Sequence, residues 1–193
     1  MNLQETKRQI LHILIGIFFS LLIIYNILTP LYLFILLMLS GLAAVLSLKY
    51  KIPIVDLFLE KFERKSSELP GKGFIMFLAG ILLALELFPR DIALASIIIL
   101  TFVDPISHFI GENFGKTKSF IDKKKNIEGH LAGFIVSSIF AMFFVHPCLA
   151  ISGALAAAVF ESTIIEIQKI KLDDNLIIPL VAGTIMLVIS MIL

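Results

Sequence analysis

Residues 91–134 read DIALASIIILTFVDPISHFIGENFGKTKSFIDKKKNIEGHLAGF, and this stretch decides the fold. An apolar run is interrupted by Asp104 and Pro105, passes into a charged segment with several glycines, and becomes apolar again after His130. Polar groups beside a bilayer are costly, so they usually mark a pathway or a reaction site. We therefore expect the chemistry of the chain to lie in a loop spanning about residues 104–130.

The composition around this stretch is that of a polytopic integral membrane protein. Of the 193 residues, 59% are hydrophobic, and the mean hydropathy of +1.01 is far above that of an ordinary soluble domain. A crossing helix needs about 20 apolar residues. The sequence predicts an all-α fold with about seven such spans, near residues 10–28, 31–48, 73–89, 91–111, 129–146, 148–168 and 176–193.

The distribution of positive charge predicts the orientation of these spans. All sixteen Lys and Arg residues except Arg90 fall on one side of a seven-span arrangement, and positive charge is retained on the cytoplasmic side. We expect a cytoplasmic N-terminus and an outside C-terminus in a cell membrane or an endoplasmic reticulum membrane. The net charge of +1 hides this polarity, and we expect no nucleic-acid partner.

The chain reads as a single membrane domain over residues 1–193. Its longest polar connection covers residues 49–72, where apolar side chains recur at helical spacing opposite charged ones. This pattern predicts an amphipathic helix over about 53–65 that lies on the cytoplasmic surface.

Asp104 followed by Pro105 has the pattern of an N-cap and a first helical position, so span 4 is predicted to break there. In the helix that follows, Asp104, His108, Gly111 and Gly115 share one face. The bare glycines permit the close approach of a ligand or of a neighbouring helix. Both alternatives remain open, and in the second Asp104 is only a cap.

The beginning of span 5 has the features of a phosphate-binding site. Asn126 is the expected N-cap, and the free backbone N–H groups of a helix start favour anionic ligands. Lys123, Lys124 and Lys125 directly precede this position. The residues expected to contact phosphates are Gly111, Gly115, Lys116, Lys118, Lys124, Lys125, Asn126 and Gly129.

Further ionisable residues are expected on the same side of the membrane. Gly153, Ala157 and Glu161 form one stripe of span 6, so Glu161 should meet a protein partner and not lipid. Asp173 and Asp174 precede span 7, where they either cap the helix or supply oxygen ligands to Mg²⁺.

Near the start of span 1, His12 follows Arg8 by one helical turn. Either His12 takes part in catalysis, or its ring is satisfied by water or a carbonyl group.

Together these motifs resemble the CTP-dependent lipid kinases, which include dolichol or polyprenol kinase, phytol kinase and the yeast-type diacylglycerol kinase. The resemblance covers residues 5 to about 183. It rests on Asp104-Pro105, Gly111, Gly115-Lys116, Lys125-Asn126-Ile127-Glu128-Gly129, Glu161, Asp173-Asp174-Asn175-Leu176 with Pro179, and the opening Arg8 to His12. The glycine-rich block alone is shared with phosphatidate cytidylyltransferases.

The resemblance implies γ-phosphoryl transfer from CTP to the hydroxyl of a membrane lipid alcohol at the cytoplasmic face. Asp104, Asp173 and Asp174 are expected to hold Mg²⁺ or to position the hydroxyl. The expected catalytic residues are Asp104, Glu128, Glu161 and His12, and either Glu128 or Glu161 is the base. Two rivals remain: a cytidylyltransferase that forms CDP-lipid, and a small anion transporter with a broken helix.

Overall fold

The computed structural model describes residues 3–50, 70–119, 125–161, 166–167, 170–171 and 173–193. Within them the chain forms seven helices and one short antiparallel strand pair, which confirms the predicted helical class. The elements are α1 (Leu3–Ile24), α2 (Pro30–Ser47), α4 (Lys72–Leu87), α5 (Arg90–Phe114), α6 (Ile127–Ala141), α7 (Pro147–Glu161), β1 (Glu166–Ile167), β2 (Ile170–Lys171) and α8 (Asp174–Ser190).

Each described helix corresponds to one predicted span, although the boundaries differ. Prolines set several of them: Pro30 and Pro147 begin α2 and α7, where the missing N–H is not needed, and α4 ends just before Pro89. The predicted sixth span extended to residue 168, whereas α7 stops at Glu161 and the chain then forms β1.

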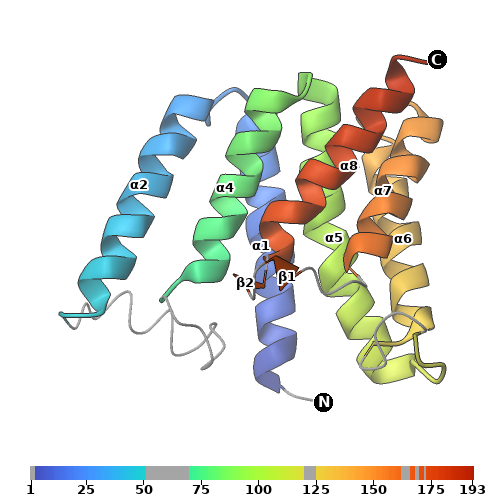
Figure 1. The fold of residues 1–193 in the computed structure, drawn as a ribbon, viewed down its shortest axis with the longest axis horizontal. Coiled ribbons are helices and arrows are strands. Elements are labelled where there is room, and N and C mark those ends of the chain that lie inside the picture. Colours follow the sequence, from blue (N-terminus) through green and yellow to red (C-terminus); the bar gives the residue numbers. More distant parts are fainter. Residues whose placement is uncertain (1–2, 51–69, 120–124, 162–165, 168–169, 172) are drawn as a thin grey trace.

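The helices form a bundle in which α2 lies at one edge and α6 and α7 lie at the other (Figure 1). The beginnings of α1, α4 and α6 and the ends of α5 and α7 lie at the end of the bundle that holds the N-terminus. The C-terminus lies at the opposite end. There Arg90 Nη2 donates to the carbonyls of Ile23 and Ile24 at 3.0 and 2.9 Å, which satisfies the last turn of α1.

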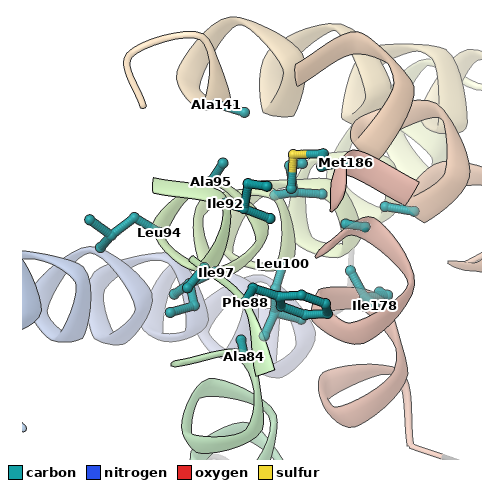
Figure 2. Packing of buried hydrophobic residues seen from close by; sticks show 14 of the residues in the cluster. Ala84, Phe88, Ile92, Leu94, Ala95, Ile97, Leu100, Ala141, Ile178 and Met186 are labelled. Carbon is teal, nitrogen blue, oxygen red and sulfur yellow. The ribbon is translucent and has the colours of Figure 1, made fainter. Parts of the chain in front are cut away.

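Helix α5 is the centre of this bundle. It contacts α1, α4, α6, α7 and α8, most extensively α6. Its residues 92–103 are all buried, and Figure 2 shows Ile92, Ala95 and Leu100 among core side chains from α4, α6 and α8. Such burial on every side is the main source of stability for a helix.

The predicted break at Asp104-Pro105 is wrong, because α5 continues through both residues to Phe114. A proline inside a helix costs about 3 kcal/mol, since it removes one hydrogen bond and crowds the preceding turn. The five neighbouring helices hold α5 in place against this cost. Asp104 is therefore a residue of the helix interior and not an N-cap.

Three helices, α1, α2 and α5, are long and apolar enough to cross a membrane. The apolar helices α6, α7 and α8 are shorter, with 15, 15 and 17 residues. Large apolar side chains are exposed along the outside of the bundle, for example Phe34 on α2 and Leu131 on α6, as expected for surfaces that face lipid. The predicted interfacial helix over 53–65 lies outside the described residues.

Candidate active site

Buried Glu161 joins three elements at the N-terminal end of the bundle. It is the last residue of α7, with only 3% of its side chain exposed. Its Oε1 lies 2.7 Å from Lys125 Nζ, and its Oε2 lies 2.7 Å from His130 Nδ1 on α6. Lys125 Nζ also donates to the backbone carbonyl of Glu161. The predicted stripe of Gly153, Ala157 and Glu161 is confirmed as a packed face, since all three are buried.

Further carboxylates lie near this ion pair. Burial by itself lowers the pKa of Lys125, but Glu161, Asp104 and Asp174 together raise it above the ordinary value for lysine. An electrostatic effect of this kind requires the carboxylates to be close to the ammonium group. Contacts thus join the end of α7 with α6 and the segment before it, and the charges of Asp104 on α5 and Asp174 on α8 act on Lys125 without an ion pair.

Asp173 belongs to the same neighbourhood and also caps α8. Its Oδ1 accepts a hydrogen bond from the backbone N–H of Asn175 at 3.1 Å, which confirms the capping alternative. Burial raises the pKa of the Asp173 carboxyl above its usual value, and the charge of Asp104 raises it further. The Asn175 N–H and Lys72 oppose this shift without cancelling it. Capping leaves the second carboxylate oxygen for another partner.

The predicted glycines lie mainly where α5 and α6 cross. A Cβ atom on Gly129 would lie 2.9 Å from Gly111 Cα and would collide with the Ser107 carbonyl. Only glycine permits this approach. At Gly111 and Gly129 the structure therefore supports the alternative in which the glycines let two helices pack closely. Contact of these glycines with phosphate stays a prediction.

Asn126 is the N-cap of α6, as predicted, but its side chain has a different partner. Asn126 Nδ2 donates to the Gly111 carbonyl at 2.6 Å instead of capping α6. A Cβ atom on Gly115 would collide with the Asn126 side chain. Gly115 therefore makes room for the bond that ties the start of α6 to the end of α5.

The segment after α5 pairs with the segment before α6. Lys118 and Asn126 form an antiparallel bridge, and Glu128 accepts the Thr117 N–H at 2.9 and 3.2 Å through its two oxygens. Lys116 and Lys118 are exposed on this pairing, where a phosphate can reach them. Glu128 is occupied with the backbone, whereas Lys124 lies outside the described residues.

His12 faces the inside of the bundle from α1. Its ring packs edge-on against Phe77 at 5.3 Å, and its Nε2 atom is buried without a partner among the described residues. One to two turns earlier, Glu5 accepts hydrogen bonds from Arg8 and Gln9 and lies 3.2 Å from His108 Nε2 on α5. Sequence reasoning did not identify Glu5, because only the packing of α1 on α5 brings it to His108.

The predicted Mg²⁺ ligands Asp104, Asp173 and Asp174 come from α5 and the start of α8. Within the described parts of the chain, no three His, Cys, Asp or Glu side chains are grouped closely enough to hold an ion by themselves. Sequence reasoning also missed His130. Its only sequence signal is its place directly after Glu128-Gly129, and the contact with Glu161 depends on how α6 packs against α7.

Comparisons with known proteins bear on this site. The chain is 26% identical to a CTP-dependent diacylglycerol kinase of Schizosaccharomyces pombe over 62% of its own length and 61% of the kinase. It is also 26% identical to a CTP-dependent diacylglycerol kinase of Eremothecium gossypii over 64% of its length and 46% of that enzyme. The chain thus spans less than two thirds of the length of either kinase.

A third relative matches almost end to end. An uncharacterized protein of Methanocaldococcus jannaschii is 31% identical over 94% of this chain and 92% of its own length. No family model and no solved structure matches the chain. The chain therefore belongs to the same family as the Methanocaldococcus jannaschii protein and is a distant homologue of the CTP-dependent diacylglycerol kinases.

Proposed function

We propose that this protein is a CTP-dependent kinase that phosphorylates the hydroxyl group of a membrane lipid alcohol. One observation carries the proposal: Lys125 pairs with buried Glu161 at 2.7 Å toward one end of the helix bundle, where the charges of Asp104 and Asp174 also act on its ammonium group. Cations and carboxylates gathered in this way suit a metal-bound triphosphate, and the homology to CTP-dependent diacylglycerol kinases points to the same chemistry.

In the proposed reaction the lipid hydroxyl oxygen forms a bond to the γ-phosphorus of CTP. The bond between the γ-phosphorus and the bridging oxygen breaks, CDP leaves, and the hydroxyl proton passes to a base. Such a transfer depends on alignment and charge neutralisation more than on covalent chemistry. Exposed Lys116 and Lys118 and the backbone N–H groups at the start of α6 supply the positive charge.

Mg²⁺ is the ion that we expect beside the triphosphate, held by Asp104, Asp173 and Asp174. Mg²⁺ prefers oxygen ligands and usually takes one or two carboxylates together with phosphate oxygens. Asp173 and Asp174 are adjacent in the chain, and the charge of Asp104 acts on Asp173, so phosphate oxygens would have to complete the set of ligands. When bound, the ion neutralises charge on the phosphates. The protein residues align the triphosphate with the lipid hydroxyl.

The proposed setting is the inner leaflet of a membrane crossed by the helices of the bundle. The apolar outside of the bundle supports a bilayer around it, and the basic segments at the N-terminal end support a cytoplasmic site. A hydroxyl at the leaflet surface then meets the carboxylates. Diacylglycerol and polyprenol or dolichol are the acceptors that we propose to compare.

The test combines purified protein, γ-labelled CTP, Mg²⁺ and a panel of these lipid alcohols. We expect label in the lipid and CDP in solution, with Asp104→Asn and Asp174→Asn lowering the rate by about 100-fold or more. Asp91→Asn is the matched control, because Asp91 lies at the opposite end of α5 and should leave the rate unchanged.

Two outcomes would contradict the proposal. Release of pyrophosphate with CMP attached to the lipid would identify a cytidylyltransferase instead. Full label transfer by both Asp104→Asn and Asp174→Asn would show that these two carboxylates are not needed for the reaction.

A further inference from the structure

His130 carries a buried nitrogen atom without a hydrogen-bond partner. Its side chain is 15% exposed, and among the described residues no protein group contacts its Nε2 through a hydrogen bond. Nearly all buried polar atoms in native proteins are hydrogen-bonded, so an exception needs an explanation. In a protein that binds substrates, such an atom is a candidate ligand contact.

The partner of the other ring nitrogen fixes which atom carries the proton. His130 Nδ1 lies 2.7 Å from Glu161 Oε2, and the other oxygen of Glu161 pairs with the Lys125 ammonium. A carboxylate in an ion pair only accepts hydrogen bonds, so His130 Nδ1 must donate. When the ring is neutral, Nε2 is then unprotonated and can accept a hydrogen bond.

An unprotonated Nε2 can accept a hydrogen bond from a ligand. Leaving it buried and unpaired costs about 1–3 kcal/mol, and a hydroxyl group that donates to it recovers this energy. If the hydroxyl proton moves fully onto Nε2, the ring becomes an imidazolium, which the Glu161 carboxylate stabilises. The arrangement of hydroxyl, histidine and carboxylate is the one that activates nucleophilic hydroxyls in other enzymes.

The position of His130 matches this role. Glu161 binds both His130 and Lys125, and the charges of Asp104 and Asp174 act on Lys125. Glu161 itself already accepts from both Lys125 and His130. Glu161 is thus a positioning residue and not a free base.

We propose that His130 Nε2 is the base that accepts the proton of the lipid hydroxyl, an inference that rests on the proposed kinase function. As the hydroxyl oxygen bonds to the γ-phosphorus and CDP departs, the proton moves from that oxygen to His130 Nε2. Glu161 keeps its charge and holds the ring through Nδ1. The imidazolium then releases the proton to water.

The kinetic test is His130→Asn, because the asparagine amide can still donate toward Glu161 but offers nothing at the Nε2 position. We expect kcat to fall by about 100-fold or more, as for loss of a general base, while KM for CTP is unchanged. His146→Asn is the matched control, since His146 is exposed at the opposite end of the bundle. Unchanged kcat in folded His130→Asn protein overturns the inference, as does a rise in KM for CTP alone.

A second measurement does not depend on turnover or on the folding of a variant. The ¹⁵N resonances of ring-labelled histidines are recorded for the wild-type protein in nanodiscs, with each lipid alcohol of the panel or with triacylglycerol, which lacks the hydroxyl. We expect an unprotonated His130 Nε2 whose resonance shifts with at least one lipid alcohol and not with triacylglycerol. A protonated Nε2, or spectra with every lipid alcohol that equal the triacylglycerol spectrum, overturns the inference. If the wild type phosphorylates no lipid, the kinase proposal fails, and this shift still decides whether Nε2 meets a lipid hydroxyl.

Discussion

Glu161 has two partners, and both are needed for its burial. A buried carboxylate is costly unless it is paired and hydrogen-bonded. Lys125 supplies the charge at 2.7 Å, and His130 supplies the second hydrogen bond at 2.7 Å. Loss of either partner therefore disturbs the other. The stability effects of single substitutions at Lys125 and His130 should not add, and the double variant is needed to measure their coupling.

At Asp173 the capping bond and the raised pKa lead to a prediction about pH. The folded protein keeps the Asp173 proton in a window just above the usual carboxyl pKa, where the unfolded chain has already released it. The contribution of Asp173 to stability is therefore largest below this window and is lost as the pH rises through it. Asp173→Asn keeps a side chain that can cap α8 but removes the charge. The stability of this variant should therefore depend less on pH across the window.

The measurement is the thermal unfolding midpoint in detergent as a function of pH, for the wild type and Asp173→Asn. Asp91→Asn serves as the control, because Asp91 is an exposed first-turn residue of α5. An unaltered curve in Asp173→Asn would contradict the assignment.

At the scale of elements, the crossing of α5 and α6 positions the site. Gly129 meets the backbone of Ser107 and Gly111, and one turn later a Cβ atom on Gly133 would collide with Ser107 Oγ. This close approach brings Asn126 within 2.6 Å of the Gly111 carbonyl. The crossing thereby fixes the start of α6, and with it Lys125 and His130.

Gly129→Ala should destabilise the protein by about 1–3 kcal/mol, the usual cost of overpacking, because the new methyl group meets backbone that cannot move aside. Gly41→Ala is the matched control in α2, where the added Cβ would meet nothing within 4 Å apart from neighbouring residues and backbone of its own helix. Alanine gains about 1 kcal/mol over glycine in a helix, so Gly41→Ala should raise the unfolding midpoint in detergent. Equal effects of the two substitutions would show that the crossing is not tight.

Sequence alone predicted the elements better than their contacts. Apolar runs bounded by prolines and charges located all seven described helices, because span length and hydropathy are local properties. The continuation of α5 through Pro105 depends on five neighbours, and the pairing of Glu161 with His130 depends on the packing of α6 against α7. Neither is encoded within a single segment.

At the scale of the molecule, residues from distant parts of the chain meet at one end of the bundle. Asp104, Lys125, Glu161 and Asp174 span 70 positions of the sequence, yet all four influence Lys125 or belong to its ion pair. Successive helices run in opposite directions, so every second connection lies at the same end of the bundle (Figure 1). This arrangement brings the four residues to the same end.

The proposed orientation can be tested with the single cysteine of the chain. Cys148 is exposed near the start of α7, at the end of the bundle away from Lys118. A membrane-impermeant maleimide should label Cys148 in intact cells. In the Cys148→Ala background, Lys118→Cys should be labelled only after permeabilisation. The reverse pattern would invert the orientation, and labelling of both sites from outside would refute a bilayer between them.

The short helices have a consequence for the lipids around them. A 15-residue helix such as α6 or α7 is about 22 Å long, whereas the hydrocarbon layer is about 30 Å thick. Thinning of the bilayer beside such helices is one way in which a membrane accommodates them. In the proposed orientation, such thinning would bring the headgroups of the inner leaflet closer to Glu161 at the end of α7, where the acceptor hydroxyl is proposed to react.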